Sequence, residues 1–331
     1  MRFAVDGWDP RYGSSFEVDE ELTDTTADVE VGIEVPRADW RPLGPTAPVT
    51  VPNRVLFVDG VRRIEARAWI DDPPDPATGA GGAADTATEG ICASYAAGVV
   101  CCTGTRAQLQ RAESRRGLFT VALHARNIQT SAGVYEACRA EPVAQRPLAA
   151  ALSQALQRRL AELELEVAHL ARANPVELGD AEDDLLVIDG PLHGRTGLPR
   201  AVGYIKSHHS AYLPRELHAL VGRLRAGQRT PVFHIGNGWN RHSWYLRLPG
   251  SPGAPWAGVV RVECSPDLTA DRVVALANLT QAVLPRYASA AYKDTRAPQN
   301  LYPIAGLERE LRRRLGDPRL LYRALRVAAA A

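Results

Sequence analysis

The sequence predicts an α/β fold, a mixed β-sheet flanked by helices, and three observations support this. Apolar and β-branched stretches in the first half have the composition of strands. A long amphipathic helix of about six or seven turns follows at residues 147–172. Further strands and then two helices follow to the end of the chain, and this order of strands, helix, strands and helices is typical of a mixed sheet with helices on its faces.

The first 50 residues predict an irregular N-terminal arm that contains a β-strand. They are rich in Pro, Asp, Glu and Thr, with Trp8 and Trp40 as scattered anchors. Polar and apolar residues alternate over 28–36 with a period of two, which indicates a strand. We expect residues 51–331 to form the main domain.

Further elements follow from local composition. The apolar run 55–58 ends at Asp59-Gly60, and residues 71–85 form a Pro/Gly/Asp-rich loop. The helix at 147–172 carries Leu152, Leu156, Leu160, Leu163, Val167 and Leu170 at spacings of three and four. The remaining predicted strands are 64–70, 91–102, 118–124, 185–188, 201–206, 231–235, 245–248 and 259–262, the last two as an antiparallel pair. The remaining predicted helices are 271–284 and 307–327.

Composition limits the classes of function. The net charge of +1 over 331 residues gives no global attraction to nucleic acid, so DNA contacts must come from local clusters. The five cysteines form no CxxC pair, which favours reduced thiols. The first residues, MRFAVDGWDPRYG, contain Asp and Pro where a signal peptide needs an apolar run, and no stretch is long enough to span a membrane. We expect a cytoplasmic protein that does not bind a membrane.

Two similar segments, VLFVDG at 55–60 and LLVIDG at 185–190, are the strongest candidates for chemistry. Each places a carboxylate, Asp59 or Asp189, after a buried strand, with a glycine that leaves room for close approach. If the two strands are neighbours, their carboxylates repel each other unless a divalent cation lies between them. Carboxylate clusters suit Mg²⁺ or Mn²⁺, and two such ions are a common device for phosphodiester hydrolysis.

Asp-Gly is also the commonest hairpin turn, and this is the main alternative at either position. The segment FVDGVRRIEARAW, from Phe57 to Trp69, is compatible with such a hairpin. Asp189 fits a turn less well, because Pro191 and the HGRTG that follows do not resume a strand.

A third carboxylate could come from the helix at 147–172, which contains Glu162, Glu164 and Glu166. At 100° per residue, Glu164 and Glu166 flank the apolar stripe, while Glu162 lies further round. We prefer Glu164 as a ligand; a solvated helix face is the alternative for each of the three.

Other known motifs are absent from the sequence. It has no GxxxxGK[ST] phosphate loop, no HExxH and no zinc-type Cys/His spacing. Gly236-Asn-Gly238 is too short for a dinucleotide loop. The adjacent His208 and His209 would point to opposite faces of a strand, so a surface or loop role is favoured over a metal site.

The order of several short motifs resembles that of the NurA family of nucleases, over about residues 50–320. These motifs are FVDG at 57–60, VIDGPL at 187–192, GYIKS at 203–207, SWYLRL at 243–248, RVE at 261–263 and NLYPIAGLERELRRRLGD at 300–317. The resemblance implies a ribonuclease H-like fold. It also implies a homodimer that acts on DNA ends with Mn²⁺ or Mg²⁺, beside a HerA-type hexameric ATPase.

Carried over to this chain, the resemblance makes Asp59, Glu164 and Asp189 metal ligands, and adds Lys206 and Tyr245 as catalytic residues. A compact lysine charge also suits a phosphate, in a chain that otherwise uses arginine. The family's C-terminal histidine has no counterpart here, since Glu308-Arg-Glu310 stands in its place.

The expected function is therefore divalent-metal-dependent DNA cleavage at DNA ends. DNA backbone contacts are expected from Arg195, Arg200, Arg241 and Arg247 and from the arginine-rich last helix. For Arg312–Arg314 of that helix, a solvated helix face is the favoured explanation. The alternative is a non-catalytic nucleic-acid-binding or adaptor protein of the same fold. A phosphoesterase acting on small nucleotides is a third possibility, which a closed pocket would favour.

Overall fold

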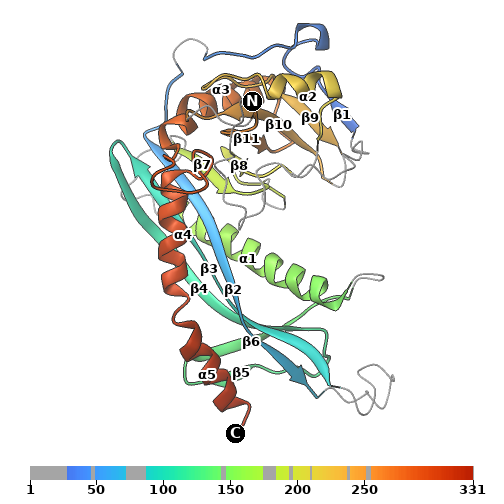
Figure 1. Ribbon diagram of the computed structural model, residues 1–331, viewed down its shortest axis with the longest axis vertical. Helices are drawn as coiled ribbons and strands as arrows, with labels where there is room; N and C mark the ends of the chain where they lie inside the picture. The colour runs from blue at the N-terminus through green and yellow to red at the C-terminus, as the bar shows by residue number, and fades with distance from the viewer. Residues whose placement is uncertain are drawn as a thin grey trace, which may run out of the picture. The chain divides into compact units, whose positions relative to one another are not determined.

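A computed structural model describes residues 28–45, 49–71, 87–142, 147–173, 184–193, 197–208, 211–236, 239–250 and 255–330. The chain forms two compact units. Unit 1 comprises Met1–Phe57, Val100–Gln108 and Leu178–Gly306, and unit 2 comprises Val58–Val99, Leu109–Glu177 and Leu307–Ala331. Figure 1 labels the elements of both.

Unit 1 contains a sheet whose strands follow the spatial order β1-β9-β10-β11-β8-β7. Strands β7 and β8 are parallel, and the other neighbouring pairs of this sheet are antiparallel. The sheet is therefore mixed, as predicted. The strands are β1 (Asp28–Glu30), β7 (Asp184–Asp189), β8 (Ala201–Ile205), β9 (Phe233–Gly236), β10 (Arg241–Arg247) and β11 (Val259–Cys264). The helices are α2 (Arg215–Val221) and α3 (Ala270–Val283), with 3-10 turns η1 (Arg37–Asp39) and η3 (Leu284–Tyr287).

The described part of the N-terminal arm is built into the core of unit 1. Strand β1 pairs with β9, and the Trp40 ring packs at a centroid distance of 6.2 Å from Phe233. Trp40 Nε1 donates to the Val31 carbonyl oxygen at 2.7 Å, which satisfies the polar atom of a buried indole. Glu34 forms a two-pronged ion pair with the buried Arg229, with both N–O distances 2.7 Å. Trp8 lies outside the described residues.

Unit 2 contains the strand order β2-β3-β4-β6-β5, in which β4 and β6 are parallel. The strands are β2 (Arg54–Ile70), β3 (Thr88–Thr103), β4 (Arg106–Thr120), β5 (Ile128–Thr130) and β6 (Gly133–Arg139). The helices are α1 (Leu148–Arg172), α4 (Tyr302–Arg314) and α5 (Pro318–Ala328). Strands β2, β3 and β4 and helix α4 each have one end in unit 1.

Helix α1 confirms the helix that the leucine spacing predicts. Five of the six predicted apolar positions are buried, at 3% exposure or less. Leu170 is the exception, at 41% exposure. Straight-chain residues and alanine dominate α1, and they lose little rotamer freedom in a helix.

Several boundaries differ from prediction, and the strand predicted at 118–124 is the end of the longer strand β4. The predicted strands 55–58 and 64–70 are one 17-residue strand, β2, so Asp59 lies inside a strand and not at its end. The predicted strand at 28–36 is confined to Asp28–Glu30. The predicted helix 307–327 is two helices, because Gly316 has a φ of +87° and Asp317 caps α5 by accepting from Arg319 N and Leu320 N.

The mixed α/β class with helices is confirmed by these elements, and none of the helices in the described ranges is long and apolar enough to cross a bilayer. All five cysteines are free thiols, as predicted. The loop predicted at 71–85 lies, apart from Asp71, outside the described residues.

Candidate functional site

Asp189 closes strand β7 at the point where the chain leaves the core of unit 1. The four residues before it are buried, and Gly190 after it has a φ of +101°, which turns the chain away from the strand direction. Gly190 N donates to the Tyr204 carbonyl oxygen at 2.9 Å, and Asp189 is the register partner of Tyr204. This pairing fixes Asp189 at one edge of the sheet, next to the end of β8.

Lys206 follows β8 and meets Asp189. Its Nζ lies 2.6 Å from Asp189 Oδ2, and both side chains are 14% exposed. The same Nζ donates to Asn300 Oδ1 at 3.1 Å, and Asn300 Nδ2 donates to Asp294 Oδ2 at 2.7 Å. The structure therefore brings two of the predicted site residues together and adds a buried amide, which holds the lysine from a second side.

One atom of this arrangement stands out. Asp189 Oδ1 is buried and has no hydrogen-bond partner among the described residues. A buried carboxylate oxygen without a partner is costly, since most buried polar atoms are satisfied by protein, water or an ion. Oδ2 is occupied by Lys206, so Oδ1 is the oxygen that remains to accept a ligand.

The surroundings of Asp189 allow close backbone approach. A Cβ at Gly203 would lie 2.9 Å from the Gly190 carbonyl oxygen and 2.9 Å from Leu192 N, so a side chain there would push the 190–192 segment away. The Tyr204 ring is fully buried and its hydroxyl donates to the Gln299 carbonyl oxygen at 2.6 Å. Burial, and then the Asp189 charge, raise the pKa of Tyr204 well above its usual value, so Tyr204 supports the site as a neutral phenol.

In unit 2, Asp59 and Glu164 are both buried, at 8% and 5% exposure. Asp59 lies on β2, and its Oδ1 accepts from Gly60 N at 2.7 Å. Glu164 lies on α1, and a Cβ at Gly60 would overlap with its Oε1 and come within 2.7 Å of Leu160 Cδ1. Gly60 thus permits the helix to bring Glu164 against the strand residue that follows Asp59, as the sequence predicts for that glycine.

The structure distinguishes among the three glutamates of α1. Glu162 pairs with Arg159 at 2.9 Å, and Glu166 pairs with Arg115 at 2.6 Å. The side chains of both glutamates are well exposed, at 61% and 43%. Glu164 is the buried one of the three, in agreement with our preference for it. Its role as a ligand stays a prediction.

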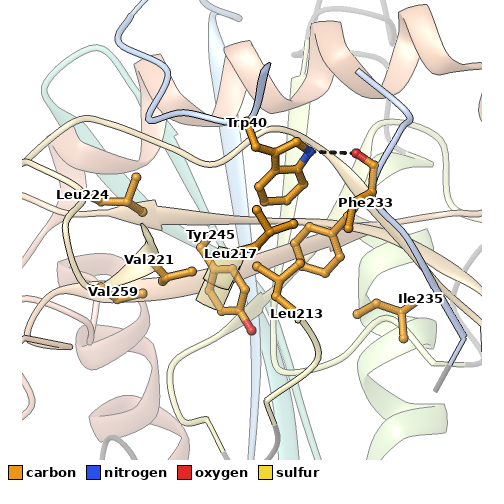
Figure 2. Close-up of a cluster of buried hydrophobic side chains, with 10 residues drawn as sticks. Trp40, Leu213, Leu217, Val221, Leu224, Phe233, Ile235, Tyr245 and Val259 are labelled. Atoms are coloured by element: carbon orange, nitrogen blue, oxygen red, sulfur yellow. Dashed lines mark hydrogen bonds between the residues drawn. The ribbon is translucent and has the colours of Figure 1, made fainter. Parts of the chain in front are cut away.

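Tyr245 is 1% exposed and belongs to the hydrophobic cluster of unit 1. Its ring stacks on Phe233 at a centroid distance of 5.8 Å, and Figure 2 shows its hydroxyl pointing away from Trp40. Burial raises the pKa of Tyr245 to about 12, so its hydroxyl is protonated near neutral pH. This placement favours a structural contribution from the ring, and the predicted catalytic role is untested.

A pocket of about 530 Å³ opens beside Asp189 and Lys206, entirely within unit 1. The pocket is also lined by Arg241, Arg261 and Glu263, together with the rings of Tyr212 and Trp239. Arg241 is therefore placed where it can meet a ligand, whereas the sequence pattern indicates only a contact to the DNA backbone.

The other arginines considered for DNA contact have different surroundings. Arg247 donates to the Ala257 carbonyl oxygen at 2.8 Å and to the Gly222 carbonyl oxygen at 3.2 Å, which is a structural role. Arg200 donates to the Asp184 carbonyl oxygen at 2.6 Å. On α4, Arg312–Arg314 pair with Glu308 and Glu310 of their own helix, which supports the solvated face expected there. Arg195 lies outside the described residues.

The described carboxylates of the two units suit a metal ion singly but not as a formed cluster. Within the described ranges, no group of three or more His, Cys, Asp or Glu side chains is arranged to hold a metal ion. The individual donors are nevertheless suitable: Asp59, Glu164 and Asp189 are buried or nearly buried carboxylates, which are the ligands that hard divalent cations prefer. The unpartnered Oδ1 of Asp189 fits such an ion best.

Comparison with known proteins gives a family match over most of the chain. A family model described as the NurA domain matches residues 54–313. Among solved structures, the chain is similar to the NurA nuclease from Sulfolobus solfataricus, with a TM-score of 0.40, 10% identity, and coverage of 83% of this chain and 84% of that one. It is also similar to the catalytic domain of human endonuclease V, with a TM-score of 0.36, 16% identity, and coverage of 81% and 85%. No curated protein sequence matches the chain.

Proposed function

Because the chain belongs to the NurA family of nucleases, we propose that it is a divalent-metal-dependent deoxyribonuclease that processes DNA ends. The observation that carries this proposal is Asp189, whose Oδ2 is held by Lys206 at 2.6 Å while its buried Oδ1 has no partner among the described residues. A lysine that fixes one oxygen and leaves the other for a ligand is suited to metal-assisted phosphodiester chemistry.

The proposed metal ligands are Asp59, Glu164 and Asp189, with Mn²⁺ or Mg²⁺ as the ion. When bound, such ions activate water and stabilise the charge on the phosphate during in-line displacement. The chain's own residues supply the carboxylates and their orientation. Gly60 permits Glu164 to approach strand β2, and Lys206 and Asn300 fix the direction in which Asp189 presents its free oxygen.

Lys206 has a second proposed task beside the phosphate. Its ammonium group has three donors, of which one is directed to Asp189 and one to Asn300. The remaining donor can bind a phosphate oxygen, and a preorganised positive charge stabilises the negative charge that develops there. Asn300 lies 94 residues after Lys206, so no local pattern in the sequence connects the two or identifies Asn300.

The proposed assembly is a homodimer that works with a HerA-type hexameric ATPase. The chain has no GxxxxGK[ST] loop, so energy for translocation along DNA must come from another protein. Its net charge of +1 gives weak long-range attraction to DNA, so a partner that delivers the strand would raise the rate of encounter. Light scattering of the purified protein and co-purification with the ATPase test this; a strict monomer that ignores the ATPase contradicts it.

The experiment that tests the nuclease proposal is cleavage of end-labelled DNA in Mn²⁺ and in EDTA. Glu164→Gln should abolish the Mn²⁺-dependent cleavage and keep the fold. Glu162→Gln is a matched control on the same helix, since Glu162 lies in an exposed ion pair, and it should cut at the wild-type rate. Equal loss in both variants, or cleavage in EDTA, contradicts the proposal. DNA binding without cleavage in Mn²⁺ would favour the non-catalytic adaptor instead.

A further inference from the structure

One wall of the pocket beside Asp189 holds two arginines that share one carboxylate. Arg261 Nη1 lies 2.8 Å from Glu263 Oε2, and Arg241 Nε lies 3.3 Å from the same oxygen. Glu263 Oε1 is already used, since it accepts from Leu192 N at 2.7 Å. The wall therefore carries two positive charges against one negative charge, and both guanidinium side chains are at least nine-tenths buried.

Neutral oxygens relieve this surplus of positive charge only in part. Arg241 Nη1 donates to the Trp239 carbonyl oxygen at 3.0 Å, and Arg261 Nη1 donates to Ser243 Oγ at 3.3 Å. Arg241 Nε has no partner in hydrogen-bonding geometry among the described residues. Burial, and then the neighbouring Arg261, lower the pKa of Arg241, as expected for a cation that would gain from an anion nearby. Paired guanidinium groups bind phosphate oxygens in planar, two-pronged geometry, so a phosphate is the anion that suits this wall.

Aromatic rings lie next to the two arginines. The guanidinium carbons of Arg241 and Arg261 lie 5.2 and 4.9 Å from the centroid of the Tyr212 ring. The guanidinium carbon of Arg241 also lies 4.7 Å from the centroid of the Trp239 ring. The Trp239 ring stacks on His193 at a centroid distance of 5.5 Å, with an angle of 15° between the planes. Aromatic rings beside a positive groove are the usual platform for nucleobases of single strands.

The size of the pocket decides between a duplex and one nucleotide. A volume of about 530 Å³ is within the range of roughly 300–1,000 Å³ that holds a small ligand. The pocket also includes Asp189 and Lys206, so a group held on the arginine wall lies in the same pocket as the proposed chemistry.

We propose that this pocket binds the terminal nucleotide of a DNA strand that ends in a phosphate monoester, with the phosphate on Arg241 and Arg261 and the base beside Trp239. A terminal monoester carries more negative charge than an internal diester, so the arginine wall selects strand ends. The assignment of DNA as the ligand rests on the proposed nuclease function, whereas binding at the arginine wall needs no metal.

The test is binding of fluorescent single-stranded oligonucleotides in EDTA, with a 5′-phosphate, a 3′-phosphate or hydroxyl groups at both ends. One phosphorylated end should bind about tenfold or more tightly than the hydroxyl-ended strand, as expected for hydrogen bonds to a charged group. Arg241→Gln should abolish this preference. If that variant does not fold, Arg241→Lys replaces it in the test and should reduce the preference. Arg111→Gln, in an exposed pair with Glu113, is the matched control and should keep it.

Trp239→Ala should weaken binding of all three oligonucleotides about tenfold by loss of the aromatic contact with the base, and keep the preference for the phosphate. Trp69→Ala is its control, since Trp69 is 69% exposed and lies in unit 2. Equal binding of phosphorylated and hydroxyl ends by the wild type overturns the proposal, as does a preference that survives Arg241→Gln. These binding measurements contain no metal, so their outcome is independent of Mn²⁺-dependent cleavage. The preference for a phosphorylated end can be absent while cleavage is present, and cleavage can be absent while the preference is present.

Discussion

Asp59-Gly60 and Asp189-Gly190 are the same dipeptide after a buried apolar stretch, yet the two glycines serve different purposes. Strand β2 continues through Gly60 for another ten residues, and α1 packs so closely on Gly60 that a Cβ would overlap with Glu164 and approach Leu160. Strand β7 ends at Asp189, and Gly190 has a φ of +101°. No atom of the described residues lies within 4 Å of the position that a Cβ at Gly190 would take.

The difference teaches that a glycine beside a functional carboxylate can be required by packing or by backbone conformation. At Gly60 the requirement comes from a neighbouring helix, so it depends on residues that are distant in the sequence. At Gly190 it comes from the dihedral angle of the residue itself, which a side chain would strain. The two positions therefore predict different responses to the same substitution.

The largest expected effect is on cleavage. Asp59→Asn and Asp189→Asn should each lower Mn²⁺-dependent cleavage by at least about 100-fold, since even residues that only orient metal ligands contribute about 10–100-fold. In the metal-free protein, Asp189→Asn should also lower the free energy of unfolding by about 1–3 kcal/mol, because Lys206 loses a charged hydrogen-bond partner. Rates on labelled DNA and chemical denaturation measure the two effects. Full activity in either variant would falsify the carboxylate site.

Lys206→Ala should give a smaller loss, of about tenfold to a hundredfold in turnover, as expected for a residue that orients a ligand. Its contact with Asp189 is lost, and with it the fixed direction of the carboxylate. The chain offers one matched control, because Lys293 is its only other lysine and lies over the ring of Tyr302 at 5.3 Å. Lys293→Ala should cut DNA normally, and equal rates in both variants would remove Lys206 from the site.

The two glycines provide the direct test of the comparison. Gly60→Ala should destabilise the protein by about 1–3 kcal/mol through overpacking. Leu160→Ala removes one of the two groups that crowd the new methyl. The loss of unfolding free energy in the double variant should therefore be smaller than the sum of the losses in the two single variants, by about 0.5–3 kcal/mol. Strict additivity, measured by denaturant unfolding, would show that the packing explanation for Gly60 is wrong.

Gly190→Ala should cost a similar amount, about 1–3 kcal/mol, but from backbone strain. No neighbouring substitution should recover the lost stability in denaturant unfolding, because no described residue crowds the new methyl. A neutral effect would mean that the segment after Asp189 adopts another conformation.

The smallest expected effect is that of Tyr245→Phe. The ring packs in the core of unit 1 and its hydroxyl, with a pKa of about 12, stays protonated through the neutral range. Loss of the hydroxyl should cost about 1 kcal/mol of stability or less. The cleavage rate between about pH 6 and 9 should keep the wild-type profile, since a group with so high a pKa does not titrate there. A changed pH profile would restore Tyr245 as a catalytic residue.

Much of the fold was predictable because it depends on local pattern. The leucine spacing predicts α1, and the apolar runs predict β7, β8 and the antiparallel pair β10–β11. Element ends were less predictable, since the division of the last helix depends on Gly316 adopting a positive φ. Strand β2 was predicted as two pieces, because its pattern changes from fully buried to alternating at Asp59-Gly60 without any break in the backbone.

The sequence by itself determined the candidate carboxylates Asp59 and Asp189, because strand composition and the Asp-Gly pair are local signals that the residues carry wherever they fold. Helical geometry also favoured Glu164 and Glu166 over Glu162. Only the tertiary structure decided that Glu164 is buried while Glu162 and Glu166 pair with surface arginines. It also decided that Asn300 holds Lys206 and that Arg241 and Arg261 share Glu263. These contacts join side chains from different elements, and packing between those elements, rather than any pattern along one of them, brings the atoms together.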